Sequence, residues 1–127
     1  MKVTPWEVSG NIDYDKLIKE FGVKPLEGAG LTHLHKHAGE HYMERRKIFF
    51  AHTNLDKVLA AADKKEKIYL YTGRAPSGPG HLGHLVPWIY AVHLQKKLGA
   101  TMLFQMPDEE KFFFKDDMTL EETEKWT

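Results

Sequence analysis

The stretch KIYLYTGRAPSGPGHLGH, residues 67–84, decides the fold of this chain. It begins with an apolar run of strand-forming residues, passes through a loop rich in glycine and proline, and delivers two histidines to the start of a helix. Val86, Ile89 and Val92 recur at three-residue spacing, and Gly99 marks the expected end of this helix. Such a helix start collects unpaired backbone N–H groups and the positive end of the helix dipole. The stretch therefore predicts a cradle for nucleotide phosphates.

A second apolar run at residues 101–106 follows the expected helix of residues 82–98. Strand, helix and strand thus succeed one another within about 40 residues, the pattern of a βαβ unit. Parallel strands joined by a right-handed crossover are expected, and the fold class is α/β.

The flanking segments predict mainly helices. An amphipathic helix is expected at residues 13–21, and another is expected to start after Thr53 or Asn54. Between them, residues 25–30 contain three helix breakers and are expected to form a loop.

Downstream of the second strand, the aromatic residues 112–114 are expected to be buried. Thr119 and Glu122 have the spacing of a capping box, which predicts one more helix at the end of the sequence.

Composition excludes several classes of protein. The 127 residues suit one ordinary domain, and 18 basic residues balance 18 acidic ones, so the chain has no global electrostatic footprint for nucleic acid. The sequence has no cysteine, which excludes disulfides and thiolate metal sites. No apolar run approaches the ~20 residues needed to cross a bilayer, and no signal peptide is evident. A cytoplasmic location is expected.

Two nucleotide motifs fit the glycine loop poorly. The Walker P-loop needs Lys-Ser or Lys-Thr after a glycine, and neither pair occurs. Gly78, Gly80 and Gly83 match the dinucleotide fingerprint G-x-G-x-x-G. The glycines begin six residues after Thr72, however, and Pro79 removes a backbone donor where pyrophosphate needs one.

The third motif, His-x-Gly-His at residues 81–84, suits the cleavage of ATP between its α and β phosphates. Glycine lets a flat adenine ring approach the backbone, and two imidazoles can donate hydrogen bonds to phosphate oxygens as charge builds up. The alternative from the residues alone is a Gly/Pro turn with two incidental histidines.

The motifs YTGRAPSG (71–78), HLGH (81–84) and FQMPDEEK (104–111) together resemble the tryptophanyl-tRNA synthetase family of the archaeal and eukaryotic type. The similarity extends upstream to IDYDKLI (12–18) and RRKIFFAH (45–52), so it covers most of the chain. These are class I synthetases, which join tryptophan to ATP as an adenylate and then transfer it to tRNA.

The resemblance implies a set of site residues. His81 and His84 match the signature histidines that hold the ATP phosphates and stabilise the transition state. The implied ATP-binding residues are Arg74, Gly83 and Lys111. The implied substrate-binding residues are Tyr71 and Gln105, which read the indole N–H, and Glu110, which faces the ammonium group. Taken singly, Tyr71 is better explained as a core aromatic, Gln105 as a strand-end surface residue and Glu110 as a solvated charge. Taken together with the histidines, the three residues favour the substrate site.

The resemblance also implies a fold and partners. Residues 67–127 are expected to be the truncated first half of a Rossmann-like parallel-sheet domain, and residues 1–66 a small, mostly helical N-terminal appendage. ATP with Mg²⁺, tryptophan and its tRNA are the implied ligands, without a prosthetic group, and the family's members are homodimers.

The sequence departs from the family in three ways. Ala75 replaces the usual glycine and Pro107 the usual threonine. The second class I signature, Lys-Met-Ser-Lys-Ser or a variant, is absent, because the only serines are Ser9 and Ser77. We therefore expect a truncated catalytic domain with weak activity or none.

Three alternative functions stay open. A tyrosyl-tRNA synthetase is disfavoured by Gln105 and Glu110. A relative that only senses tryptophan or nucleotide would bind its ligand without turnover, and a dinucleotide oxidoreductase would bind NAD.

Four histidines lie close together at positions 33, 35, 37 and 41. Two histidines four apart can chelate zinc, but a polar surface segment without metal is the expectation.

Overall fold

The computed structural model describes residues 2–3, 8–9, 14–76, 78–114 and 119–127. It divides into two compact units, Met1–Ala60 and Ala61–Thr127, which are treated separately below. The boundary expected at residues 66 and 67 stays a prediction. Within the described ranges, no helix has the length and apolar character needed to cross a membrane.

The first unit begins with two short strands, β1 (Lys2–Val3) and β2 (Val8–Ser9), which pair antiparallel. Helix α1 (Tyr14–Phe21) follows and ends at Gly22, whose φ of 60° is the left-handed conformation typical of glycine after a helix. This confirms the helix predicted there, although residue 13 lies outside the described residues.

Two further strands, β3 (Lys24–Pro25) and β4 (Ala51–His52), pair antiparallel. Helix α4 (Leu55–Asp63) starts directly after β4, where the sequence predicted it, and crosses from the first unit into the second. The imidazole Nδ1 of His52 accepts a hydrogen bond from the backbone N–H of Leu55 at 3.2 Å, which satisfies one donor of the first helical turn.

Helix α2 (Gly28–Ala38) corrects the loop predicted at residues 25–30. Glycine costs roughly 0.5–1 kcal/mol relative to alanine in a helix, but burying a leucine gains roughly 1.5–3 kcal/mol. Leu34 and Ala38 of α2 are 3% and 0% exposed, so packing outweighs the poor helix propensity of Gly30. Gly28 starts the helix with a φ of 55°, a conformation that favours glycine.

Helix α3 (Tyr42–Arg45) is joined to α2 by a buried carboxylate. Glu44 Oε2 lies 2.7 Å from His35 Nε2 and accepts a hydrogen bond from the backbone N–H of His41 at 3.1 Å. The side chain of Glu44 is only 1% exposed, so these bonds supply polar partners that water cannot.

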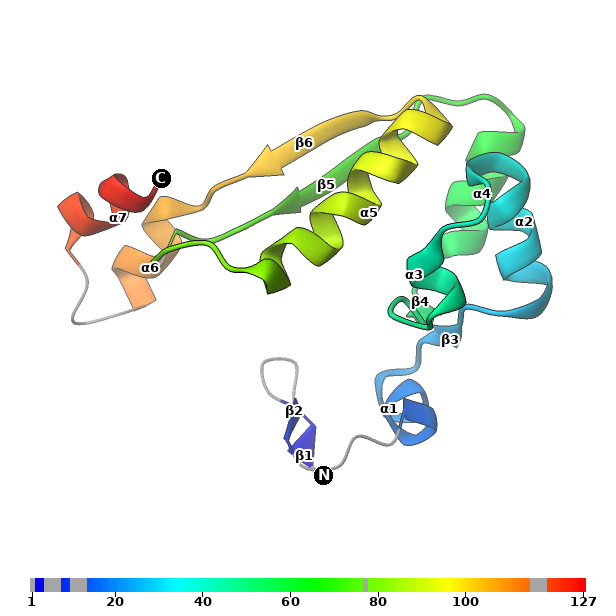
Figure 1. The fold of residues 1–127 in the computed structure, drawn as a ribbon, viewed down its shortest axis with the longest axis horizontal. Helices are drawn as coiled ribbons and strands as arrows, with labels where there is room; N and C mark the ends of the chain where they lie inside the picture. Colours follow the sequence, from blue (N-terminus) through cyan, green and yellow to red (C-terminus); the bar gives the residue numbers. More distant parts are fainter. Residues whose placement is uncertain (1, 4–7, 10–13, 77, 115–118) are drawn as a thin grey trace. The chain divides into compact units, whose positions relative to one another are not determined.

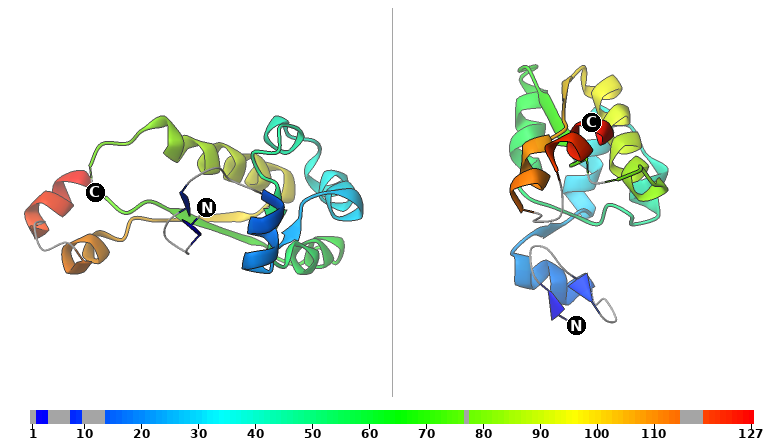
Figure 2. Two further views of the ribbon diagram at one scale, coloured as in Figure 1. Left: turned by 90° about the horizontal axis from the view of Figure 1, so that it is seen from below. Right: turned by 90° about the vertical axis from the view of Figure 1, so that its left-hand side faces the viewer.

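The second unit is built on a strand–helix–strand element (Figures 1 and 2). Strands β5 (Tyr69–Gly73) and β6 (Thr101–Gln105) run parallel, with Tyr69 opposite Thr101 and Gly73 opposite Gln105. Helix α5 (Leu82–Leu98) connects them and lies along the pair. It ends at Gly99 in the left-handed conformation, as predicted. The predicted α/β class with a parallel βαβ unit is confirmed.

The two faces of the parallel strands differ, because successive side chains of a strand point to opposite faces. Leu70 and Thr72 are half-buried, whereas Tyr69 and Tyr71 are 55% and 69% exposed. The exposed face therefore carries Tyr71 and, by the same alternation, Gly73 at the end of the strand.

Two helices complete this unit, α6 (Asp108–Phe114) and α7 (Leu120–Trp126). Thr119 and Glu122 form the predicted capping box, with the Thr119 hydroxyl accepting from the backbone N–H of Glu122 at 3.2 Å. The burial predicted for residues 112–114 is wrong for Phe112 and Phe113, which are 40% and 75% exposed. A helix of seven residues turns successive side chains about 100° apart, so it cannot bury them together.

Candidate functional site

The carboxyl ends of β5 and β6 open into a pocket of about 280 Å³. Seven residues line it: Tyr71, Gly73, Arg74, Ala75, Gln105, Pro107 and Glu110. Four of them, Tyr71, Arg74, Gln105 and Glu110, are site residues predicted from the sequence. Parallel strands end at one edge of a sheet, and this is the edge at which α/β folds bind ligands.

The floor of this pocket depends on a glycine. Gly73 faces Gln105 across the two strands, and a Cβ added to Gly73 would collide with the Gln105 carbonyl oxygen. That same oxygen accepts a hydrogen bond from the backbone N–H of Arg74 at 3.0 Å. Sequence reasoning did not single out Gly73, although glycine in a strand often marks a close approach of two backbones.

The Arg74 side chain joins the pocket to the glycine loop. Its Nη2 donates a hydrogen bond to the backbone carbonyl of Gly78, and a Cβ on Gly80 would lie 3.7 Å from its Nη1. Its Nε is buried without a hydrogen-bond partner among the described residues. A buried N–H group without a partner is costly, so Arg74 has a donor available for an anionic ligand.

His81 and His84 cap the start of α5. Nδ1 of His81 accepts a hydrogen bond from the Gly83 backbone N–H at 3.2 Å, and Nδ1 of His84 accepts from the His81 backbone N–H at 3.1 Å. A ring nitrogen that accepts a hydrogen bond carries no proton, so the proton of each neutral imidazole is on Nε2. Both histidines therefore keep an Nε2–H donor.

The surroundings of His84 favour its neutral form. Partial removal from water, and then the positive charges of His81 and Arg74, lower the pKa of His84 below its ordinary value of 6.5. At neutral pH, His84 thus acts as a hydrogen-bond donor through Nε2 without carrying a charge.

Glycine at position 83 is favoured for a local structural reason, besides the predicted approach of adenine to the backbone. A Cβ at this position would come within 3.0 Å of Nδ1 and Cε1 of the His81 imidazole. That distance is tighter than ordinary van der Waals contact, so glycine here lets the His81 ring fold back onto the helix start.

The last predicted site residues lie on α6. Glu110 lines the pocket and is exposed. Lys111 follows it, but its side chain lies outside the described part of the chain. At the start of the same helix, a hydrogen bond shared with the Glu109 side chain, and then the bond that the Glu109 backbone N–H donates at 2.9 Å, lower the pKa of Asp108.

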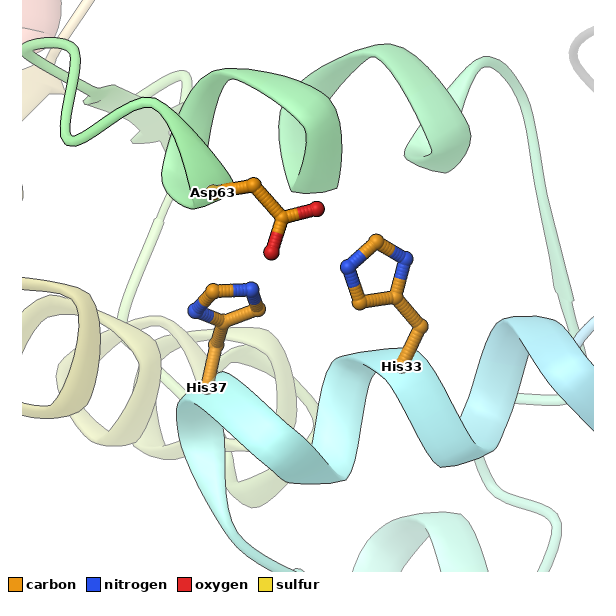
Figure 3. Close-up of side chains that lie close together, drawn as sticks. All are labelled: His33, His37 and Asp63. Atoms are coloured by element: carbon orange, nitrogen blue, oxygen red, sulfur yellow. The ribbon is translucent and has the colours of Figure 1, made fainter.

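The histidine cluster of the first unit lies on α2 and at the start of α3. His33 and His37 are one turn apart on α2, with ring centroids 5.4 Å apart (Figure 3). Two imidazoles leave half of a tetrahedral zinc shell open. Asp63, which Figure 3 also labels, ends α4 and belongs to the second unit, so we do not count it as a third ligand. The expected lack of a metal site stays a prediction.

Comparison with known proteins shows which family this chain resembles. Residues 63–113 match the model of the family described as tRNA synthetases class I (W and Y). The tryptophan–tRNA ligase of Pyrobaculum calidifontis is 50% identical over 125 residues, and that of Thermococcus onnurineus is 46% identical over 128 residues. Each comparison covers 98% of this chain and 33% of the relative.

Solved structures of tryptophanyl-tRNA synthetases have the same fold. The enzyme of Plasmodium falciparum superposes with a TM-score of 0.84 at 36% identity, over 91% of this chain and 32% of that one. The enzyme of Encephalitozoon cuniculi, solved with bound tryptophan, gives 0.82 at 36% identity, over 90% and 34% of the two chains. The resemblance predicted from the motifs is confirmed, as is the Rossmann-like fold, and the chain spans about a third of these relatives.

Proposed function

We propose that this chain is the portion of a tryptophan–tRNA ligase that holds tryptophan and ATP for formation of the adenylate. One observation carries the proposal. Tyr71 and Arg74 come from one segment of the sequence and Gln105 and Glu110 from another, yet all four line a single pocket at the carboxyl ends of two parallel strands. Incidental residues would not converge in this way on the edge where α/β sheets bind ligands.

The exposed face of the strands provides the amino-acid half of the site. The Tyr71 hydroxyl and the Gln105 amide can both accept the indole N–H, and the Glu110 carboxylate can pair with an ammonium group. A pocket that must satisfy polar groups with a substrate N–H discriminates against analogues without it by up to about 10⁴–10⁵. The substrate we assign to this half is tryptophan.

The start of α5 provides the nucleotide half. The Nε2–H groups of His81 and His84 are donors for phosphate oxygens, and Arg74 adds a cation with a buried unpartnered Nε. Adenine is assigned to the backbone at Gly83, and this requires the His81 ring to swing away from that glycine. Lys111 is assigned to the nucleotide as well, and ATP is taken up as its Mg²⁺ complex.

The proposed reaction needs no protein nucleophile. An oxygen of the tryptophan carboxylate attacks the α-phosphorus of ATP, the bond from that phosphorus to the bridging oxygen breaks, and pyrophosphate leaves with the electron pair. Charge accumulates on the phosphate oxygens as the pentavalent centre forms. Each imidazole donor placed there stabilises that state by about 2–4 kcal/mol.

The complete reaction and its partners go beyond this chain. Transfer to tRNA, the homodimer and a cytoplasmic location follow from the family resemblance and are part of the proposal. The lysine of the second class I signature, which would bind pyrophosphate, has no counterpart in a sequence whose only serines are Ser9 and Ser77. For this chain we propose binding of tryptophan and ATP and formation of the adenylate, with the boundary of the nucleotide domain at residue 67.

Exchange of labelled pyrophosphate into ATP tests the proposal. We expect exchange that depends on tryptophan, that tyrosine does not support, and that falls about 10²–10³-fold in His84→Ala. Lys97→Ala, at the other end of α5, is the matched control and is expected to keep the exchange. Saturable binding of NAD without competition from ATP would overturn the proposal, as would exchange supported equally by tyrosine.

A further inference from the structure

Trp88 lies between the nucleotide half of the proposed site and the second strand. Its ring is stacked on that of His84, with centroids 6.0 Å apart and planes inclined by 21°. On its other side it meets Phe104 of β6 edge-on, at 5.1 Å and 71°. Both distances are within the range in which aromatic rings attract one another.

A hydrogen bond alone does not hold the His84 ring. The bond from the His81 backbone N–H favours the tautomer protonated at Nε2, but it forms only while the ring keeps its orientation, which rotation about the side-chain bonds can change. Stacking limits this rotation, because it favours one orientation of the ring face. His81 supplies one stacking partner at 3.8 Å and Trp88 the other.

The two stacking partners of His84 differ in what holds them. The proposed function requires His81 to move when adenine reaches Gly83, so His81 cannot hold His84 during binding. Trp88 is fixed through Phe104, which sits in the sheet opposite Thr72. The indole therefore ties the His84 ring to the rigid part of the unit.

We propose that Trp88 is a positioning residue for His84, and that its indole keeps the Nε2–H of His84 directed away from the helix start and toward the phosphates. This inference rests on the proposed function for the identity of the ligand, but the orientation of His84 is a property of the ligand-free chain. The two therefore have separate tests.

Nitrogen NMR of the His84 imidazole at pH 8 reports which ring nitrogen carries the proton in the ligand-free chain. In the wild type we expect the tautomer protonated at Nε2, with Nδ1 accepting a hydrogen bond. Trp88→Leu is expected to lower the ratio of this tautomer to the other roughly 2–12-fold, the change that corresponds to an aromatic pair. Trp88→Phe keeps a ring and is expected to restore the wild-type signals, and Ile89→Ala, at an exposed neighbouring position, is the control.

Wild-type nitrogen shifts of His84 in Trp88→Leu would overturn the inference. If Trp88→Leu does not fold, Phe104→Leu serves instead, because it leaves the indole in place and removes its support. It is expected to shift the same tautomer ratio by a smaller factor, and unchanged signals would again overturn the inference.

Binding of Mg·ATP separates this inference from the proposed function. Trp88→Leu is expected to weaken binding roughly 2–12-fold and Trp88→Phe to leave it within about twofold. Equal ATP binding by the wild type and His84→Ala would refute the proposed function, while the NMR signals would still decide the role of Trp88. Loss of binding in His84→Ala with none in Trp88→Leu would refute the positioning role alone.

Discussion

Gly73 and Gln105 face one another at the ends of β5 and β6, so closely that the Gln105 carbonyl oxygen occupies the place where a Cβ of residue 73 would be. The same oxygen accepts the backbone N–H of Arg74 at 3.0 Å. The pairing of the two strands and the position of two pocket residues thus depend on the absence of a side chain at one position.

Gly73→Ala is expected to separate the strand ends and to destabilise the second unit by about 1–3 kcal/mol, the usual cost of overpacking. Thermal unfolding followed by circular dichroism measures this loss. Gly80→Ala is the matched control, because a Cβ there meets only the flexible end of Arg74 at 3.7 Å. Equal stability of the two variants would show that the strand ends tolerate a methyl group.

The cap of α5 is expected to depend on pH. Since the folded-state pKa of His84 is lowered below 6.5, the unfolded chain binds a proton first as the pH falls. The stabilisation of the folded chain by neutral His84 is complete above pH 6.5. It is lost as the pH falls through the lower pKa that His84 has in the folded chain. The amide signal of His81, whose N–H donates to Nδ1 of His84, follows this loss between pH 8 and pH 5.

His84→Gln is the control for this titration. Glutamine at the third helical position can accept the same hydrogen bond from the His81 backbone N–H without an ionisable group, so the His81 amide signal should change less over this range. If the wild type and His84→Gln respond to pH alike, another group controls the cap.

The carboxylate of Glu44 is expected to be the main polar support of the first unit. Glu44→Ala leaves His35 and the backbone N–H of His41 without this partner, and is expected to cost about 1–3 kcal/mol. Urea unfolding measures the cost. Glu40→Ala breaks an exposed pair with Arg45 and is expected to cost no more than about 1 kcal/mol. A smaller loss for Glu44→Ala than for Glu40→Ala would contradict the role of the buried carboxylate.

Local signals predicted the second unit well. The start and end of α5 and the capping box of α7 depend on residues within one helical turn, so they are legible in the sequence. The positions of Tyr71, Arg74, Gln105 and Glu110 came from the family resemblance, and the structure brings these residues to one pocket. Their roles toward ligands remain proposals.

Features that depend on contacts between distant segments were not predictable. The start of α2 was missed because Gly28 looks like a breaker, whereas it begins the helix with a φ of 55° and burial of Leu34 stabilises the turns that follow. The close approach of Gly73 to Gln105 requires the strand register, which no local pattern supplies. The contact of Trp88 with Phe104 likewise requires the placement of β6 against α5, whereas His84 and Trp88 are neighbours four residues apart on one helix.

The central claim is that the pocket recognises tryptophan, and isothermal titration of this chain with tryptophan tests it most directly. Tyrosine and an analogue with sulfur in place of the indole N–H are the comparison ligands, and Gln105→Leu is the comparison variant. We predict saturable binding of tryptophan, much weaker binding of both comparison ligands, and a loss of this preference in Gln105→Leu, because the amide that accepts the N–H is gone. Equal binding of tryptophan and the sulfur analogue by the wild type, or an unchanged preference in Gln105→Leu, would contradict recognition of the indole N–H by Gln105 in this pocket.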